Sequence, residues 1–400
     1  MPTQLKPNID WVGHVDWSIR DFHSYDTVRG ATYNSYLIRD EKTALIDGVN
    51  ANFTQYQIDN IAALTPLEKV DYIVCNHTEL DHAGSIPELL RALPNATLLC
   101  NAKCLETMRL YFDTTGWPVQ VVTPEEKITL GKRTLNFVNT PMVHWPESMF
   151  TYIPEEELLF SMDAFGQHLA TSARFDDEHD MNEILVEAKI YYANIVTPYG
   201  KQVQTTFGKV ENLKIGMIAP SHGLIWRSHI PAILDCYQEW SSGIYRPKAL
   251  ILFDTMWHST EMMAEYILKG AIEAAPEVDT QFMYVRRTSL TRIATEMLEA
   301  AAVAVGSPTL NMMMMPQMAA VLNYIKGLKF TPKSSFSFGS YGWAGAGCEQ
   351  CNHWLDEAGW TRLCEPIKTK YRPGHETLAQ CREAGKLLGL AARERSGSLR

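Results

Sequence analysis

The sequence lacks the features that mark several large classes of protein. It has no apolar run near the roughly 18 residues of a membrane-spanning helix, and its first segment, MPTQLKPNIDWVGHVDW, lacks the pattern of a secretory signal. Positive charge is in deficit, with 36 Lys and Arg against 46 Asp and Glu, and an acidic surface repels nucleic-acid phosphates. The 8 cysteines are spread thinly, which is typical of reduced thiols. We therefore expect a cytoplasmic protein that binds neither nucleic acid nor a membrane.

The length and the apolar pattern of the chain predict more than one domain, since domains average about 150 residues. Residues 1–246 mix short strand-like runs with helical segments, which predicts a two-sheet α+β sandwich covered by helices. Residues 247–400 alternate strands and helices, which predicts an α/β doubly wound parallel sheet. A Ser/Gly/Pro stretch over Trp240–Lys248 suits a linker. The expected strands of the second part are Ala249–Phe253, Gln281–Val285, Ala302–Val305, Ser335–Phe338 and Arg362–Pro366.

Four candidate metal ligands lie within six residues, directly after an apolar strand: His77, Glu79, Asp81 and His82. The first three alternate, so an extended stretch would point them the same way, and His82 would turn in at the bend before a helix near Ile86. A solvent-facing polar loop explains so dense a cluster poorly. Strand ends that feed loops are where scaffolds place functional side chains.

Three further candidates each follow an apolar strand later in the chain: His144, Asp163 and His222. Alone, each has an ordinary interpretation as a hydrogen-bonded residue near a strand end. Together with the first cluster they provide four histidines and three carboxylates, which is enough for two metal ions and one bridging carboxylate.

Three loops at the expected carboxyl ends of strands in the second part predict a flavin site. Their residues are Thr255, Met256, Trp257, His258, Ser259 and Thr260 in the first loop, Ser307, Pro308, Thr309 and Asn311 in the second, and Gly339, Ser340, Tyr341, Gly342, Trp343 and Gly345 in the third. In a flavodoxin-like strand order these loops converge on one crevice, and hydroxyls with backbone N–H groups at a helix start suit a phosphate. Neither GxGxxG nor Walker A occurs, so we predict FMN and not a dinucleotide or ATP bound by those motifs. Cys348 and Cys351 form a CxxC pair without thioredoxin context, and we interpret it as structural.

The series His77-x-Glu79-x-Asp81-His82, His144, Asp163 and His222 resembles the ligand set of the metallo-β-lactamase superfamily. That superfamily usually has a histidine where Glu79 stands and binds zinc, whereas a carboxylate suits iron better. With the flavin loops behind it, the chain resembles the flavodiiron proteins, also called A-type flavoproteins. The resemblance implies a metallo-β-lactamase-like αββα sandwich over residues 1–246 and a flavodoxin-like FMN-binding domain over residues 247–400.

The resemblance also implies the roles of the ligands and the reaction. One iron takes His77, Glu79 and His144, the other takes Asp81, His82 and His222, and Asp163 bridges them, although the family allows His82 to stand off the metal. The reaction implied is reduction of O2 to water, of NO to N2O, or both, as a defence in an anaerobe. Electrons would come through FMN from a partner such as rubredoxin or from reduced deazaflavin, and a head-to-tail homodimer is expected. His23 and either Tyr191 or Tyr192 are candidates to line the gas pocket.

Two alternatives remain at this point. One is a zinc-dependent hydrolase of the glyoxalase II type fused to a flavodoxin-like electron carrier, and Glu79 and the flavin loops count against it. The other is an electron carrier that uses only the flavodoxin part, which leaves an intact ligand set unexplained. The metal ligands are shared by O2 and NO reduction, so both substrates stay open.

Overall fold

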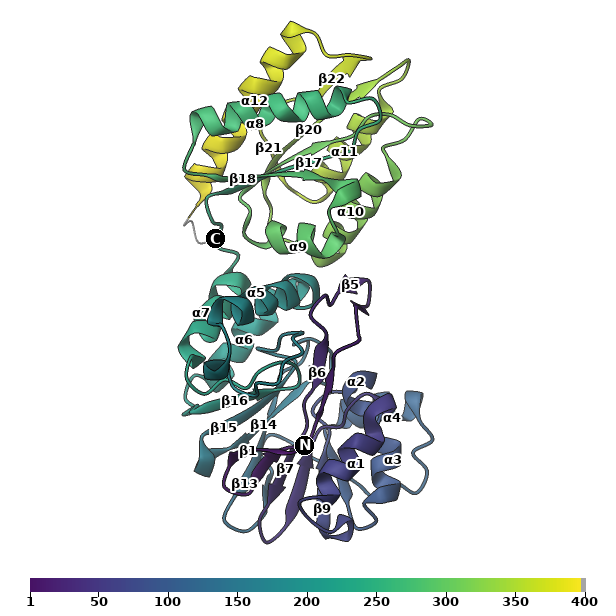
Figure 1. The fold of residues 1–400 in the computed structure, drawn as a ribbon, viewed down its shortest axis with the longest axis vertical. Coiled ribbons are helices and arrows are strands. Elements are labelled where there is room, and N and C mark those ends of the chain that lie inside the picture. The colour runs from purple at the N-terminus through teal and green to yellow at the C-terminus, as the bar shows by residue number, and fades with distance from the viewer. Residues whose placement is uncertain (397–400) are drawn as a thin grey trace. The chain divides into compact units, whose positions relative to one another are not determined.

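The structure, a computed structural model, describes residues 1–396 and contains two compact units (Figure 1). The first comprises residues 1–191 and 201–238, and the second comprises residues 192–200 together with the chain from residue 239 onward. A domain boundary between residues 246 and 247 stays a prediction. Among the described residues no helix combines the length and the apolar character that crossing a membrane requires.

The first unit contains two sheets with helices on their outer faces. Its strands are β1 (Thr3–Lys6), β2 (Ile9–Trp11), β3 (His14–Asp16), β4 (Asp21–Phe22), β5 (Tyr25–Asp26), β6 (Ala31–Tyr33), β7 (Tyr36–Arg39), β8 (Thr43–Ile46), β9 (Val70–Val74), β10 (Thr97–Cys100), β11 (Val119–Val121), β12 (Lys127–Thr129), β13 (Thr134–Asn139), β14 (Met149–Ile153), β15 (Leu158–Met162) and β16 (Met217–Pro220). Its helices are α1 (Thr54–Ala62), α2 (Leu80–Ala83), α3 (Ile86–Ala92), α4 (Ala102–Tyr111), α5 (Met181–Tyr191) and α6 (Gly200–Val210), together with most of α7 (Ile230–Ser242).

The two sheets of the first unit face each other across an apolar core. The seven-stranded sheet has the order β1-β2-β7-β8-β9-β10-β11, and the five-stranded sheet has the order β12-β13-β14-β15-β16. Side chains from both sheets, such as Ile46, Val74, Phe137 and Phe160, belong to one buried cluster. A second cluster joins the other face of the larger sheet to α1, α3 and α4. These two clusters cover both faces of the larger sheet, and the predicted layered sandwich is confirmed.

The second unit is a doubly wound parallel sheet. Its strands are β17 (Lys248–Phe253), β18 (Asp279–Tyr284), β19 (Ala302–Gly306), β20 (Ser334–Tyr341), β21 (Thr361–Arg362) and β22 (Ile367–Lys370), and its helices are α8 (Ser259–Ala274), α9 (Leu290–Glu299), α10 (Pro316–Leu328), α11 (Ala346–Glu357) and α12 (His375–Arg395). The strand order is β18-β17-β19-β20, and both β21 and β22 pair with β20 in parallel. The flavodoxin-like order predicted from the sequence is therefore confirmed.

The last strand of the second unit differs from the expectation. The prediction of a single strand over Arg362–Pro366 is wrong, because the chain pairs with β20 twice, at β21 and again at β22. Pro366 lies just before β22, and proline has no N–H group to donate to a ladder. This interruption moves the longer pairing to Ile367–Lys370, which continues to the carboxyl end of the sheet.

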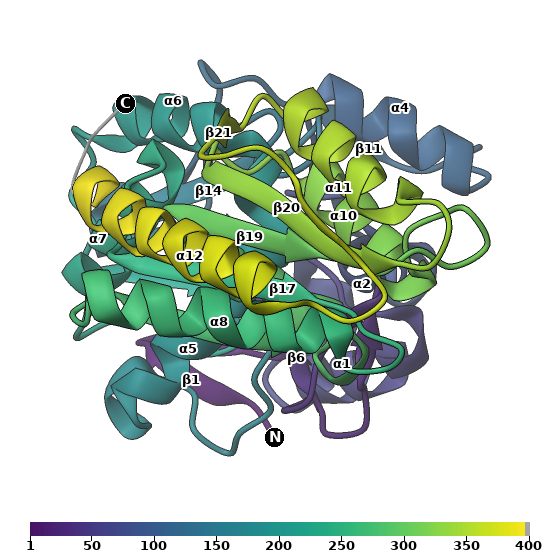
Figure 2. The ribbon, with the colours of Figure 1, turned by 90° about the horizontal axis from the view of Figure 1, so that it is seen from above.

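Helices α8 and α12 lie side by side on one face of this sheet (Figure 2). Their close approach depends on glycine, because a Cβ at Gly270 would stand 1.9 Å from the carbonyl oxygen of Arg382, and one at Gly385 would stand 2.0 Å from that of Ile267. The small residues let the two backbones approach closely, which packs α8 against α12.

Candidate functional site

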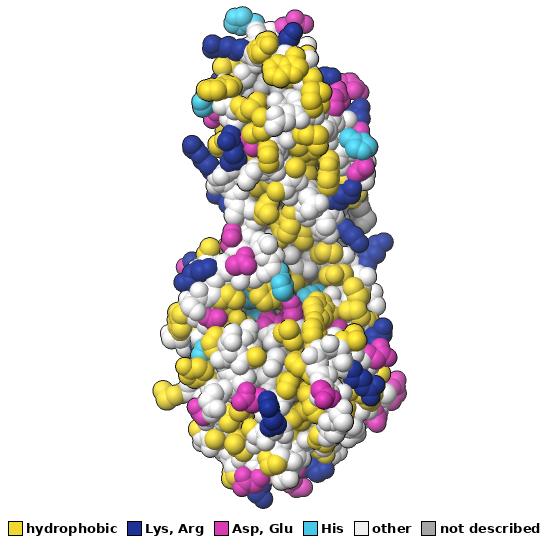
Figure 3. All heavy atoms as spheres, turned by 90° about the vertical axis from the view of Figure 1, so that its right-hand side faces the viewer, with side chains coloured by type: hydrophobic (Ala, Val, Ile, Leu, Met, Phe, Trp, Pro, Cys, Tyr) yellow, Lys and Arg dark blue, Asp and Glu magenta, His cyan; other side chains and the backbone are white. Residues whose placement is uncertain are grey.

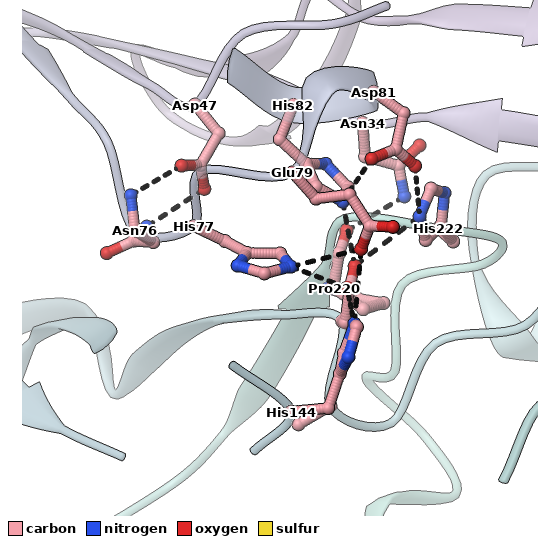
Figure 4. A network of polar contacts seen from close by, with 12 residues as sticks. Asn34, Asp47, Asn76, His77, Glu79, Asp81, His82, His144, Pro220 and His222 are labelled. Atoms are coloured by element: carbon pink, nitrogen blue, oxygen red, sulfur yellow. Dashed lines mark hydrogen bonds and ion pairs between the residues drawn. The ribbon is translucent and has the colours of Figure 1, made fainter. Parts of the chain in front are cut away.

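All seven candidate ligands of the first unit meet at one end of the sandwich, and each lies just beyond a strand. His77 and Glu79 follow β9, Asp81 and His82 lie on α2, His144 lies between β13 and β14, Asp163 follows β15 and His222 follows β16. Figure 4 shows the side chains of six of them pointing toward one another: His77, Glu79, Asp81, His82, His144 and His222. The structure therefore brings together all the residues that the sequence singled out, from segments up to 145 positions apart.

The local conformation of the first cluster is not the extended stretch that we expected. Asp81 and His82 belong to the short helix α2, for which Glu79 is the N-cap residue with extended backbone. The expected alternation therefore fails after Glu79. The helical turn instead separates the pair on α2 from His77 and Glu79, which divides the ligands between two groups.

Asp163 connects these two groups through its two carboxylate oxygens. Oδ2 lies 2.9 Å from Nε2 of His144 and 3.3 Å from Nε2 of His77. Oδ1 lies 2.9 Å from Nε2 of His82 and 3.4 Å from Nε2 of His222. A carboxylate that presents one oxygen to each of two ligand groups has the geometry of a bridge.

The remaining carboxylates complete one group each. Oε2 of Glu79 lies 3.3 Å from Nε2 of His77 and 3.3 Å from Nε2 of His144. Oδ2 of Asp81 lies 3.1 Å from Nε2 of His222. Within the first group and within the Asp81, His82 and His222 group, the candidate ligand atoms all lie within 4.8 Å of one another, and every one of these residues is buried.

The polar atoms of this cluster fit metal ions better than they fit one another. Among residues 1–396, both oxygens of Asp81, both ring nitrogens of His82 and Oδ1 of Asp163 are buried without a hydrogen bond of acceptable geometry. Burial disfavours the ionised carboxyl of Asp163, but the surrounding imidazoles outweigh it and hold its pKa well below its usual range. Buried polar atoms that converge without hydrogen bonds are what a metal site requires.

Two carboxylates that sequence reasoning missed support the ligands from behind. Oε1 of Glu147 accepts hydrogen bonds from Nδ1 of His77 at 2.8 Å and from the hydroxyl of Thr78 at 2.7 Å. Asp47 accepts bonds from the backbone N–H and the side-chain amide of Asn76, at 2.7 and 2.9 Å. Both contacts fix the loop that carries His77. The only sequence signal was that Glu147 lies three residues after His144.

The three candidates for the gas pocket, His23, Tyr191 and Tyr192, differ in their burial and in their distance from the ligands. Nε2 of His23 lies 2.7 Å from Oε1 of Glu79, and the His23 side chain is 68% exposed. Figure 3 shows histidine and acidic side chains next to one another on the surface of the first unit. Tyr191 is buried and its ring stands 6.0 Å from that of His222, whereas Tyr192 belongs to the second unit and packs on Trp240. His168, which the sequence analysis did not single out, is also buried with its ring 4.7 Å from that of His222.

The three predicted loops of the second unit meet around one cavity of about 610 Å³, a volume suited to a cofactor. Ten of the predicted residues line it: Met256, Trp257, Ser259, Pro308, Thr309, Asn311, Ser340, Tyr341, Gly342 and Trp343. Five further residues line it: Leu310 and Ala344 lie within the predicted loops, and outside them lie Met312, Tyr371 and Arg372. The last two follow β22, so they were missed because the final strand was placed too early.

The other predicted residues of these loops lie around the cavity without lining it. They are Thr255, His258, Thr260, Ser307, Gly339 and Gly345. The hydroxyls of Thr260 and Ser340 lie 2.9 Å apart and join two of the loops. Gly339 is required by close packing, because a Cβ there would stand 2.0 Å from the carbonyl oxygen of Ser307.

The amino-terminal end of α8 suits an anionic group. Among the described residues Oγ1 of Thr255 is buried without a hydrogen-bond partner, and it lies in the loop that opens this helix. Free backbone N–H groups and the helix dipole favour a phosphate at such a position. Trp257 and Trp343 flank the cavity with largely exposed rings, which suits stacking on a flat heterocycle.

Comparison with known proteins divides the chain in the same way. The family model described as ODP family beta lactamase matches residues 31–223, and the flavodoxin model matches residues 251–385. A nitric oxide reductase of Moorella thermoacetica is 40% identical over 390 residues, which covers 96% of this chain and 97% of that protein. The crystal structure of the flavodiiron protein of Giardia intestinalis matches with a TM-score of 0.95 at 35% identity, over 99% of this chain and 97% of that one. The rubredoxin oxygen:oxidoreductase of Desulfovibrio gigas matches with a TM-score of 0.95 at 35% identity, over 100% of both chains.

Proposed function

The chain belongs to the flavodiiron protein family, and on that basis we propose that it is an oxidoreductase that reduces NO to N2O, O2 to water, or both. The first unit provides the site for a non-haem diiron centre, and the second provides the site for FMN. The observation that carries this function is the position of Asp163, with one carboxylate oxygen toward each ligand group.

We propose that the seven residues keep the roles that the family resemblance implies. His77, Glu79 and His144 would hold one iron, and Asp81, His82 and His222 the other, with Asp163 between them. The contact of 2.9 Å between His82 and Asp163 supports a place for His82 in the second group. When bound, the iron pair supplies the electrons and the open coordination positions that gas reduction needs. Three carboxylates offset much of its positive charge.

The surrounding side chains would orient the ligands and supply protons. Reduction of two NO molecules to N2O and water consumes two electrons and two protons, and reduction of O2 to two water molecules consumes four of each. His23 is exposed to solvent and its Nε2 lies beside Glu79, so we propose that it passes protons from solvent to the site. The hydrogen bond to Glu79 raises the pKa of His23, which favours the proton-carrying form. Tyr191 would close the inner side of the pocket.

In the second unit we propose that the loop Thr255–Thr260 holds the FMN phosphate at the start of α8. The aromatic residues Trp257, Tyr341 and Trp343 would enclose the isoalloxazine ring. FMN accepts and releases single electrons, so it links a donor to the metal centre. We further propose rubredoxin or a similar carrier as that donor, a cytoplasmic location and a head-to-tail homodimer, all of which the resemblance implies.

The hydrolase alternative is not favoured, because Glu79 occupies a ligand position and the second unit is built for a flavin. The test is to purify the protein, measure its iron, zinc and flavin content, and follow NO and O2 consumption after anaerobic reduction. We expect two irons and one FMN in each chain, with turnover of at least one gas. A protein that is active only with zinc, and only in ester or thioester hydrolysis, would overturn the proposal.

A further inference from the structure

A small apolar cavity in the first unit is lined by chain neighbours of two of the proposed ligands. It has a volume of about 10 Å³, which is about the space that one water molecule needs. Its lining includes Val143, which precedes His144, and Ala164, which follows Asp163. The cavity is therefore lined by a chain neighbour of His144 and a chain neighbour of Asp163, the two ligands whose side chains contact each other.

The walls of this cavity are mostly apolar, and Thr206 and Tyr237 are the lining residues that carry hydroxyl groups. The atoms that face the cavity are apolar, and the side chains of Phe150 and Val203, both buried from solvent, contribute to them. The one phenol in the wall, that of Tyr237, accepts a hydrogen bond of 2.8 Å from the backbone N–H of Phe165. A polar molecule would lose its hydrogen bonds on entering, whereas apolar gases such as xenon occupy such cavities without this cost.

The outer wall of the cavity separates it from a surface groove between α6 and α7. Phe207 and Val210 line both the cavity and this groove. Val210 is buried and Phe207 is half-buried at the protein surface. Phe207, the more exposed of the two, therefore stands between the groove and the cavity.

From this arrangement we propose that the cavity is the route by which NO or O2 enters the metal centre, with Phe207 as its gate. The inference rests on the proposed function and adds the path of its substrate. Both gases are small, uncharged and weakly hydrated, so an apolar passage concentrates them while it excludes water and ions. Protons would use the opposite kind of path, the polar face at which His23 contacts Glu79.

Xenon tests the site without any reference to activity. We expect a crystal of the holoprotein under xenon pressure to show one xenon atom between Val143 and Val203. The variant Val203→Trp should lose this atom, because the larger side chain fills the space. The matched control is Thr205→Trp on the exposed side of the same helix, which should bind xenon as the wild type does. A wild-type cavity that stays empty under xenon would overturn the proposal.

Kinetics with dissolved gas tests the route. With iron and FMN content unchanged, Val203→Trp should lower kcat/KM for the gas about tenfold at constant kcat, because entry and not chemistry is slowed. Val203→Leu adds less volume and should have a smaller effect in the same direction, which covers the case that the larger variant does not fold. Phe207→Ala removes the gate and should leave kcat/KM at or above the wild-type value. If the wild type reduces the gas and both Val203 variants keep the wild-type kcat/KM, the route is wrong while the proposed function stands. A wild type that does not reduce either gas would instead refute the proposed function, and the route with it.

Discussion

Oε1 of Glu147 lies 2.8 Å from Nδ1 of His77, across the imidazole ring from Glu79, whose Oε2 lies 3.3 Å from Nε2. The same Glu147 oxygen accepts the backbone N–H of Thr78 at 3.0 Å, so the carboxylate is held in place from two directions. Nδ1 of His77 therefore carries the proton, and Nε2 presents its lone pair toward the ligand group. Burial alone would raise the pKa of Glu147, but the bonds from His77 and Thr78 lower it to about 2, so it stays an anion.

This relationship predicts that Glu147 controls iron affinity without being a ligand. Glu147→Gln should weaken iron binding about tenfold, and Glu147→Ala more, since such supporting carboxylates are worth roughly 10–100-fold in metal affinity. Competition with a calibrated chelator measures the change. The control Glu125→Gln is exposed and far from the ligands in sequence, and should bind iron normally. Unchanged affinity in Glu147→Ala would show that His77 needs no such support.

Asp163→Asn should remove both irons together. The two oxygens of Asp163 face different ligand groups, and the amide replaces one of them by an NH2 group that cannot bind a cation. The buried charge of two ions would also lose one of its three offsetting carboxylates. Metal analysis with Mössbauer spectroscopy decides the point. Loss of one iron with the other unaltered would indicate a terminal ligand and not a bridge.

Glu79→His should weaken the selectivity for iron and abolish gas reduction, while FMN remains bound. Oε2 of Glu79 lies between two imidazoles, and a third imidazole there gives the softer set that suits zinc. The flavin loops belong to the other unit, so flavin absorbance serves as the internal control. A variant with full iron content and wild-type gas turnover would contradict this role of Glu79.

The second unit could be predicted closely from sequence because its strands and helices follow one another in a regular rhythm. The predicted strand Ala249–Phe253 became β17 with one added residue, and the predicted strand Ala302–Val305 became β19, also with one added residue. The first unit was harder. Strands such as β4 (Asp21–Phe22) have only two residues and so carry no periodicity, and α2 has only four residues, too few for a helical pattern.

The candidate ligands could be found because each follows an apolar strand, which is a local signal. The supporting residues could not, because their partners are distant in sequence. Glu147 meets His77 across 70 positions, and Asp47 meets Asn76 across 29. An isolated acid in a loop is usually a solvated residue, so only the folded chain shows that these two carboxylates are buried and bonded.

Glu187 should make the stability of the first unit depend on pH. It is buried on α5, and burial raises its pKa to about 7, although Arg29 lies 3.3 Å away and opposes the shift. Since the unfolded chain ionises near the ordinary value, it binds fewer protons than the folded chain between about pH 4.5 and 7, and stability falls as pH rises through this range. Glu187→Gln does not lose stability in this way. Its free energy of unfolding, relative to that of the wild type, should therefore rise by on the order of 1–2 kcal/mol between pH 5 and pH 8.

Urea denaturation of both proteins at pH 5 and pH 8, monitored on the first unit, measures this difference. The control is Glu106→Gln on the exposed face of α4, whose difference from wild type should not change with pH. If the stability difference between Glu187→Gln and wild type is also independent of pH, the Glu187 carboxyl is ionised at ordinary pH in the folded protein. Arg29 then compensates its burial in full.

The last prediction concerns the homodimer, in which FMN of one chain would face the irons of its partner. Around the flavin cavity the side chains of Trp257 and Trp343 are each 87% exposed, and Tyr371 is 63% exposed. We interpret this exposed apolar rim as a docking surface, and the family resemblance implies that a second copy covers it. The test mixes two inactive variants under subunit exchange, His144→Ala with a broken metal site and Ser259→Glu with a broken phosphate loop. In a two-fold arrangement each mixed dimer regains one complete site, so activity should return to about a quarter of wild type, because half of the dimers are mixed and one of their two sites works. If exchange is demonstrated and activity stays at zero, electrons pass within one chain and the head-to-tail arrangement is wrong.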